Sequence, residues 1–146
     1  FAVDTTPPDI KDITQLPSND IQSQDRVKVN ATVTDNFSGV KQVTLIYTYT
    51  FSDETGNATL TMTNLEADLW NATIPMFPTG TNVIYAITAE DNVGNTNTSK
   101  EIEYNVNPTI PEFPSPFAAL LTITAAATAL GTARIRLLSK KRKKTR

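Results

Sequence analysis

Carboxylate and amide side chains gather in two segments whose composition is typical of turns: Asp35-Asn36 and Glu90-Asp91-Asn92, with Asn95 close behind. Oxygen atoms of these types are the ligands that Ca²⁺ takes in proteins. Asp35, Asp91 and Asn92 are therefore candidate calcium ligands. The same side chains also fix turns by accepting hydrogen bonds from the backbone, and the sequence contains no EF-hand loop. Calcium binding and turn stabilisation both stay open at this point.

The composition excludes most other chemistry. The 146 residues contain no Cys and no His, which excludes disulfides, thiol nucleophiles and Cys-type zinc sites and removes the usual general base. A carboxylate pair such as Asp35 and Asp91 can serve acid–base catalysis, but nothing beside it in the sequence indicates a substrate cleft. No phosphate-binding glycine loop is found. We expect a protein without catalytic activity, and without a cofactor other than the candidate calcium ion.

Five Asn-x-Ser/Thr triplets are candidate acceptors for N-glycosylation. They begin at Asn30, Asn36, Asn57, Asn71 and Asn97. Strand alternation turns Asn30 and Asn71 outward, and the other three fall in or beside turns. The sequence therefore predicts a glycosylated exterior, with chance occurrence in a Thr-rich β-protein as the alternative.

Seven segments have the alternation or the β-branched and aromatic content of strands: residues 10–13, 26–34, 40–51, 57–63, 69–74, 82–90 and 100–106. No segment of this part has helical periodicity. Seven short strands within about 100 residues indicate a two-sheet β-sandwich. In such a topology the turns that carry Asp35 and Asp91 share one pole with a leading segment that carries Asp4 and Asp9. Trp70 falls on the inward face of its strand, and we interpret it as core packing rather than as a ligand-stacking residue.

Charge divides the chain into two parts. All 15 acidic residues lie between Asp4 and Glu112 with only 5 basic residues, so this part has a net charge of −10. The other 8 basic residues follow an uncharged run at 117–133: Arg134, Arg136, Lys140, Lys141, Arg142, Lys143, Lys144 and Arg146. A helix over 117–138 would measure roughly 33 Å, enough to cross the bilayer's hydrocarbon core of about 30 Å if the two arginines snorkel. We predict a transmembrane helix at 117–138 rather than a buried core helix.

Basic residues beside a membrane span stay on the cytoplasmic side. The predicted localisation is therefore the cell membrane with a single pass, the N-terminal domain outside the cell and the tail at 139–146 in the cytoplasm before any processing. Membrane lipid is the expected partner of the basic cluster. A nucleic-acid-binding arm would fit the charge alone, but not its position directly behind an apolar run, so we expect no nucleic-acid partner.

Three stretches carry a resemblance to a known class of fold: VDTTPPDI at 3–10, DNFSGVKQVTLIY at 35–47 and VIYAITAEDNVGN at 83–95. They resemble the immunoglobulin-like and fibronectin type III-like modules of prokaryotic surface proteins, over residues 3–106. The resemblance implies an all-β, seven-stranded immunoglobulin-like/fibronectin type III-like β-sandwich, and it implies no activity. The Cys…Trp…Cys pattern of antibody domains is absent.

Four prolines in ten residues make the segment 107–116 an extended stalk. It contains Pro111, Glu112 and Phe113, and the apolar run and the basic cluster follow it. In this order the three parts resemble the C-terminal sorting signals of the PEF-CTERM type, an archaeal family thought to be processed by membrane transpeptidases called archaeosortases. The resemblance implies an archaeosortase-type processing enzyme as a partner. A plain stalk with a membrane anchor is the alternative.

The predicted organisation is a linker at 1–9, a sandwich at 10–106, the stalk at 107–116, the transmembrane helix at 117–138 and the tail at 139–146. Because the chain begins without an initiator Met or a secretory signal, we expect it to be the C-terminal part of a longer exported protein. We predict a non-catalytic, membrane-anchored cell-surface module that spaces, adheres or associates with a surface layer, with surface proteins or glycans as partners. The alternative is an accessory domain of a secreted or surface-anchored hydrolase whose catalytic domain lies upstream.

Overall fold

The structure, a computed structural model, describes residues 3–109. This part of the chain is all-β. Its strands are β1 (Asp9–Leu16), β2 (Val27–Thr34), β3 (Val40–Phe51), β4 (Glu54–Thr61), β5 (Thr63–Glu66), β6 (Leu69–Ile74), β7 (Asn82–Asp91), β8 (Thr96–Thr98) and β9 (Ile102–Asn105).

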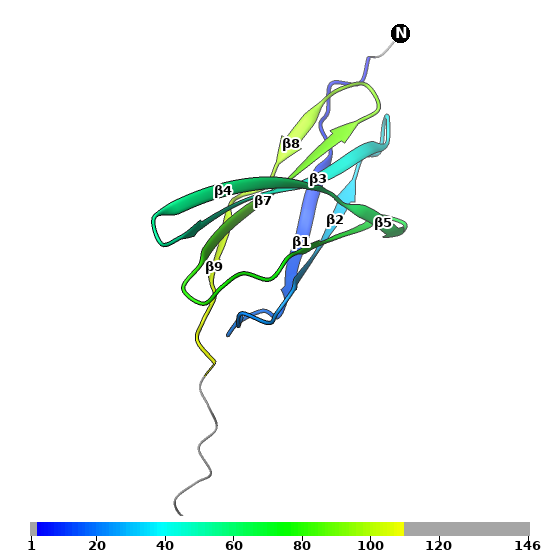
Figure 1. The fold of residues 1–146 in the computed structure, drawn as a ribbon. Coiled ribbons are helices and arrows are strands. Elements are labelled where there is room, and N and C mark those ends of the chain that lie inside the picture. Colours follow the sequence, from blue (N-terminus) through cyan, green and yellow to red (C-terminus); the bar gives the residue numbers. More distant parts are fainter. Residues whose placement is uncertain (1–2, 110–146) are drawn as a thin grey trace, which may run out of the picture. The chain divides into compact units, whose positions relative to one another are not determined.

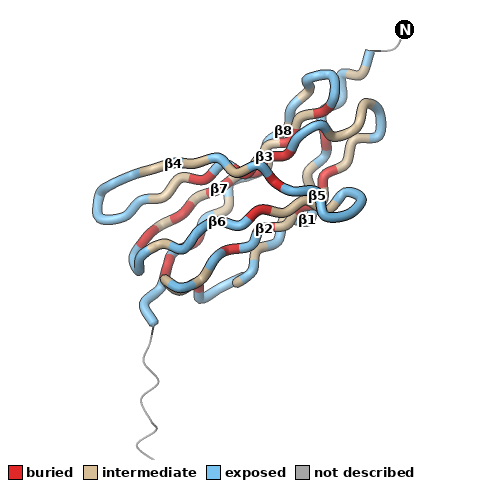
Figure 2. The backbone as a smooth tube through the Cα atoms, turned by 45° about the vertical axis from the view of Figure 1, so that its right-hand side comes forward, coloured by how far each residue is buried: buried red, intermediate tan, exposed pale blue. Residues whose placement is uncertain are grey.

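The strands form two antiparallel sheets (Figure 1). One sheet has the order β1-β2-β6-β5. The other has the order β4-β3-β7-β8, and β9 also pairs with β7. Figure 2 shows that buried and more exposed residues alternate along the strands, as they do when each sheet turns one face to a shared core. The predicted two-sheet β-sandwich is confirmed.

The core is built from the inward positions of strands in both sheets. The two longest inward series are Val27, Val29, Ala31 and Val33 in β2, and Val83, Tyr85, Ile87 and Ala89 in β7. Complete burial of an apolar side chain of this size contributes about 1.5–3 kcal/mol. The hydroxyl group of Tyr85 also donates a hydrogen bond to Oε1 of Gln15 in β1 (2.9 Å), which joins the two sheets.

Two segments differ from the prediction. The expected strand at 57–63 is divided, because β4 ends at Thr61 in one sheet and the chain crosses at Met62 to begin β5 in the other. The expected strand at 100–106 corresponds to β9. A further short strand, β8, comes before it in the sequence and pairs with the same strand, β7. Between β8 and β9, the Ser99 amide donates to Ile87 O (2.8 Å) and the Ser99 hydroxyl oxygen accepts from the Ile87 amide (3.0 Å). Residues 3–109 therefore contain nine strands instead of seven.

The chain arrives and leaves at opposite ends of the sandwich (Figure 1). We call the end where residues 3–8 arrive the N-terminal pole and the other end the C-terminal pole. Backbone hydrogen bonds hold the chain at the C-terminal pole, from Gly80 to Val106 O (2.8 Å), from Val106 to Thr81 O (2.9 Å) and from Asn107 to Ile21 O (2.7 Å). The ordered contacts of the sandwich thus extend through Asn107, one residue past the predicted boundary.

Several predictions concern residues outside the described part. These are the sorting motif at 111–113, the transmembrane helix at 117–138 and the basic tail at 139–146. Within residues 3–109, no helix is long and apolar enough to cross a membrane.

Candidate metal centre

Three segments that are far apart in the sequence form the N-terminal pole: the leading segment (residues 3–8), the β2–β3 turn and the β7–β8 turn (Figure 1). Strand alternation explains why each turn places a carboxylate there. Asp35 comes two residues after the buried Val33, and Asp91 comes two residues after the buried Ala89. Each carboxylate therefore continues the inward series of its strand by one step. Both side chains stand at the mouth of the core instead of on the outer face.

The Asp35 carboxylate organises the β2–β3 turn. Its Oδ1 accepts hydrogen bonds from the backbone amides of Phe37 (3.1 Å), Ser38 (2.8 Å) and Gly39 (2.7 Å). Gly39 has φ of 80°, a left-handed conformation that glycine adopts without a steric cost. The turn-stabilising role predicted for Asp35 is present, and it uses only one of the two carboxylate oxygens.

Asp91 does the same in the β7–β8 turn, where it is fully buried. Its Oδ1 accepts from the amides of Val93 (2.9 Å) and Asn95 (2.8 Å), and its Oδ2 accepts from Nδ2 of Asn95 (2.7 Å). Burial by itself would raise the pKa of Asp91, but the hydrogen bonds from Asn95 and Val93 outweigh burial and lower the pKa below its ordinary value. The carboxylate is therefore held in its charged form.

Asn92 joins the two turns to each other. Its Nδ2 donates to the carbonyl oxygens of Ser38 (2.7 Å) and Gly39 (3.1 Å), and its backbone amide donates to Gly39 O (3.1 Å). The structure thus gives Asn92, predicted as a calcium ligand, a clear role in positioning the turns that carry Asp35 and Asp91.

Two further asparagines attach the leading segment to the β7–β8 turn and β8. Nδ2 of Asn95 donates to Asp4 O (3.2 Å), and Nδ2 of Asn97 donates to Pro8 O (2.9 Å). These bonds join residues about 90 positions apart in the sequence, and they bring Asp4 over the two turns.

The three carboxylates consequently meet. One oxygen each from Asp4, Asp35 and Asp91 lies within 4.8 Å of the other two. Oδ1 of Asp4 accepts from the Thr6 amide (2.9 Å), whereas Oδ2 of Asp4 is buried without a hydrogen-bond partner. Three carboxylates at this separation repel one another, and a cation between them would relieve the repulsion. An all-oxygen donor set without His or Cys suits Ca²⁺ rather than Zn²⁺.

Two predicted members of this acidic cluster are engaged elsewhere. Asp9 forms an ion pair with Lys11. Glu90 forms an exposed ion pair with Lys41 across the sheet (2.6 Å). The proposed sharing of one pole by the two turns and the leading segment is correct, and Asp4 is the residue that the leading segment supplies.

A family model described as a domain of unknown function (DUF7743) matches residues 2–119, which include the whole sandwich. The chain belongs to the DUF7743 family. No curated protein matches it.

The DUF7743 sandwich places the five glycosylation candidates in three different settings. Asn36 and Asn57 are exposed. Asn30 and Asn71 are half-buried and are direct register partners in β2 and β6, so their Cβ atoms are about 4.5–5.5 Å apart. Asn97 uses its amide nitrogen, the atom that would carry a glycan, to hold Pro8. Strand alternation predicted the outward direction of Asn30 and Asn71, but not that they are neighbours.

Sequence reasoning missed a second polar region of the DUF7743 domain. Trp70 packs against the core, as predicted, but it stays half-buried because it also lines a cavity between the β2–β3 turn and the β5–β6 turn. Asn64 and Asp68 line the same cavity. Nothing in the alternation of β6 distinguishes Trp70 from the buried Ala72 and Ile74.

Proposed function

We propose that this DUF7743 chain is a non-catalytic, membrane-anchored cell-surface module that spaces or presents other parts of a longer exported protein. The observation that carries the proposal is the position of the two ends of the sandwich at opposite poles (Figure 1). Modules with this arrangement extend in a line when they are joined in series. The reading frame upstream tests the proposal: repeated sandwich modules support it, and a catalytic domain supports the accessory role in a hydrolase instead.

The strand order supports an immunoglobulin-like or fibronectin type III-like topology within this proposal. The sheet β1-β2-β6-β5 corresponds to the A, B, E and D strands of an immunoglobulin sandwich, in the order that the fold requires. In the other sheet, strand C would correspond to β3 and strand F to β7. Strand G would correspond to β8 and β9, which both pair with β7, and β4 adds a strand next to β3. No Cys is needed for this topology.

The membrane part of the proposal rests on the sequence beyond residue 109. The predicted helix at 117–138 would be the anchor, and the basic tail at 139–146 would be cytoplasmic. Protease added to intact cells should digest the sandwich and spare the tail. Digestion of the tail from outside would overturn this topology.

Cleavage at the Pro111-Glu112-Phe113 motif would distinguish a sorting signal from a permanent anchor. If an archaeosortase-type enzyme processes the protein, the mature form should end near Phe113 and carry a new C-terminal attachment. Intact mass of the protein from its native membrane measures this directly. A peptide that runs unbroken from Asn107 to Arg134 in most mature molecules would rule out processing and leave the plain anchor.

We further propose that Ca²⁺ binds at the N-terminal pole and fixes the leading segment. The buried, unpartnered Oδ2 of Asp4, in a group of three carboxylates, favours this second function. Because Asp35 and Asp91 already serve their turns, the ion would add the leading segment to a pole that is otherwise formed. Its effect is therefore expected on the orientation of residues 3–8 as well as on stability.

Thermal unfolding of the full chain, with Ca²⁺ and with a chelator, tests the calcium proposal. A ligand that binds only the native state raises the melting temperature, so millimolar Ca²⁺ should raise it. Asp4→Asn should remove most of the rise while leaving both turns intact. Asp53→Asn, in the exposed β3–β4 turn, is the matched control and should keep the full rise. No rise in the unaltered chain would leave the turn-stabilising role as the complete account.

A further inference from the structure

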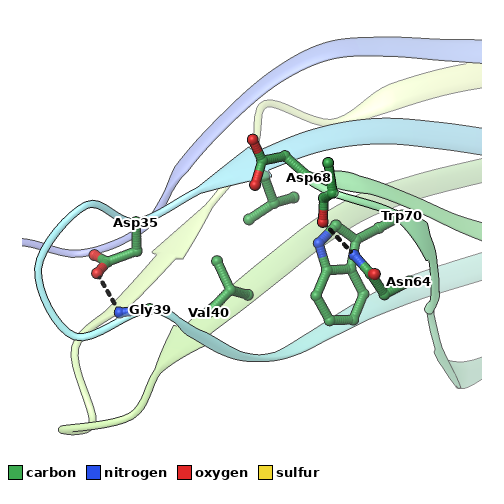
Figure 3. Close-up of a pocket in the computed structure, with 8 residues that line it drawn as sticks. Asp35, Gly39, Val40, Asn64, Asp68 and Trp70 are labelled. Atoms are coloured by element: carbon green, nitrogen blue, oxygen red, sulfur yellow. Dashed lines mark hydrogen bonds between the residues drawn. The ribbon is translucent and has the colours of Figure 1, made fainter.

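A cavity of about 440 Å³ opens on one side of the sandwich, where the β2–β3 turn faces the β5–β6 turn. Its walls include Asp35 and Val40 from the first region and Asn64, Asp68 and Trp70 from the second (Figure 3). This volume lies in the range of about 300–1,000 Å³ that is typical of small-molecule sites. None of the eight described residues that line it is a lysine or an arginine.

Trp70 supplies the apolar wall of the cavity. The two residues on the same face of β6, Ala72 and Ile74, are 8% and 0% exposed, whereas Trp70 stays half-buried. Part of the indole packs on the core and the rest borders the cavity. In Figure 3 the edge of the indole that carries the nitrogen is turned toward Val40 and Asp35. Trp70 thus presents a flat apolar surface and one N–H donor to a ligand in the cavity.

The polar wall consists of hydrogen-bond acceptors that are already positioned. Nδ2 of Asn64 donates to Ala67 O (2.9 Å), which directs the amide and leaves its Oδ1 as an acceptor. The backbone of Asp68 is fixed because its carbonyl accepts from the Val33 amide (2.9 Å). Its exposed carboxylate adds two acceptor oxygens to the rim. A ligand for this cavity must therefore bring donors.

We propose that this cavity binds a neutral sugar residue of a surface or environmental glycan. A pyranose ring has one face of C–H groups that can cover an indole, and its rim carries hydroxyl groups that donate to carboxylate and amide oxygens. The acidic wall disfavours uronic acids, phosphates and nucleic acids, because no cationic side chain would neutralise them. This function goes beyond the spacing role, and the cavity shares one residue, Asp35, with the proposed calcium site.

A cationic side chain from a protein partner is the competing ligand, since carboxylates and an indole also attract ammonium and guanidinium groups. One observation favours the sugar: the volume of about 440 Å³ exceeds what one such headgroup fills. The indole N–H group, on the edge that Figure 3 shows turned toward Val40 and Asp35, can also donate to a hydroxyl oxygen of a sugar, whereas an ammonium or guanidinium group offers no acceptor.

The test uses the intrinsic fluorescence of Trp70, which is the one tryptophan in the chain. The full chain is kept in a detergent without a sugar headgroup and titrated with cellotetraose, mannotetraose, chitotetraose, tetragalacturonate and arginine amide. We expect a saturable change with at least one of the three neutral sugars and no change with tetragalacturonate. A change with arginine amide but with no neutral sugar would assign the cavity to a cationic partner, and no change with any probe would overturn the proposal.

Two variants connect the fluorescence change to the cavity. Asp68→Asn keeps the shape of the side chain but removes a charged acceptor, and it should weaken binding of the active sugar by about tenfold. Glu66→Gln neutralises an exposed carboxylate two residues away that does not line the cavity, and it should bind as the unaltered chain does. Equal affinity in all three proteins would show that the sugar binds elsewhere, against the proposal.

Discussion

The two poles of the sandwich hold the chain by different means. At the N-terminal pole, side chains hold the leading segment: Asn95 and Asn97 donate to its carbonyl groups, and Asp91 organises the turn that carries Asn95. At the C-terminal pole, hydrogen bonds between backbone groups hold Val106 and Asn107, which pair with Gly80, Thr81 and Ile21. Side-chain contacts that include carboxylates respond to pH and to metal ions, whereas a backbone ladder packed on apolar residues does not. The N-terminal pole is therefore the adjustable end of the module.

Ile21→Ala should give the largest effect and should show that the C-terminal pole is indifferent to solution conditions. Ile21 is 3% exposed, and its carbonyl accepts from Asn107. Truncating a buried isoleucine costs about 2–5 kcal/mol. Denaturant unfolding should find the same loss at pH 7 and at pH 5, with Ca²⁺ or with a chelator. A loss that varies with Ca²⁺ would mean that the two poles are coupled.

Asp91→Asn should reveal the pH response of the N-terminal pole. The hydrogen bonds that lower the pKa of Asp91 stabilise the fold fully above the ordinary aspartate pKa of about 3.9, and this contribution is lost as the pH falls through the lower pKa of the folded state. The variant should melt at a lower temperature at neutral pH. As the pH falls below about 4, its melting temperature should fall less than that of the unaltered chain. Asp53→Asn is again the control, and an identical acid response in all three proteins would contradict the prediction.

Asn97→Ala and Asn107→Ala compare one asparagine at each pole. Asn97→Ala removes the hydrogen bond to Pro8 and should cost about 0.5–1.5 kcal/mol. Asn107→Ala keeps the backbone bond to Ile21 and removes only a long contact between Nδ2 and Asp20 (3.4 Å), so it should cost less. Denaturant unfolding measures both. The reverse order would show that side chains, not the backbone, hold the C-terminal pole.

Glycan occupancy should differ among the five acceptor sites with little effect on stability. Asn36 and Asn57 should be occupied because they are exposed, and Asn97 should be unmodified because its nitrogen holds Pro8. Asn30 and Asn71 should never both carry a glycan on one molecule, since they are register partners. Mass spectrometry of the peptides from protein made in its native host measures occupancy. Full modification of both partners would mean that β2 and β6 are not paired as the structure has them.

The parts of the fold that alternate clearly could be predicted from the sequence. In β2 and β7 every second residue is buried without interruption. Continuing this pattern two residues past Val33 and Ala89 leads to Asp35 and Asp91. β8 could not be predicted, because its three residues are polar and become a strand only by pairing with β7. β5 is exposed throughout and likewise depends on its neighbour β6.

The candidate sites show the same limit. The meeting of the two turns followed from topology, but the contribution of Asp4 depends on the bonds that Asn95 and Asn97 make across about 90 residues. The half-burial of Trp70 depends on where the β5–β6 turn lies, which the sequence of β6 does not specify. Contacts between polar loops that are far apart in the sequence leave no periodic pattern in it, so the sequence could not predict them.

The placement of residues 3–8 and of β9 at opposite poles of the sandwich has a mechanical consequence. Tension on a surface protein would pull β1 and β9 along their own axes, in opposite directions (Figure 1). Strands loaded in this way slide against their neighbours, so their hydrogen bonds must break together rather than one after another. β1 is paired with β2 at 6 positions, and β9 is paired with β7 at 4. β9 should yield first, and in a chain anchored as proposed this would lengthen the tether while the rest of the sandwich stays folded.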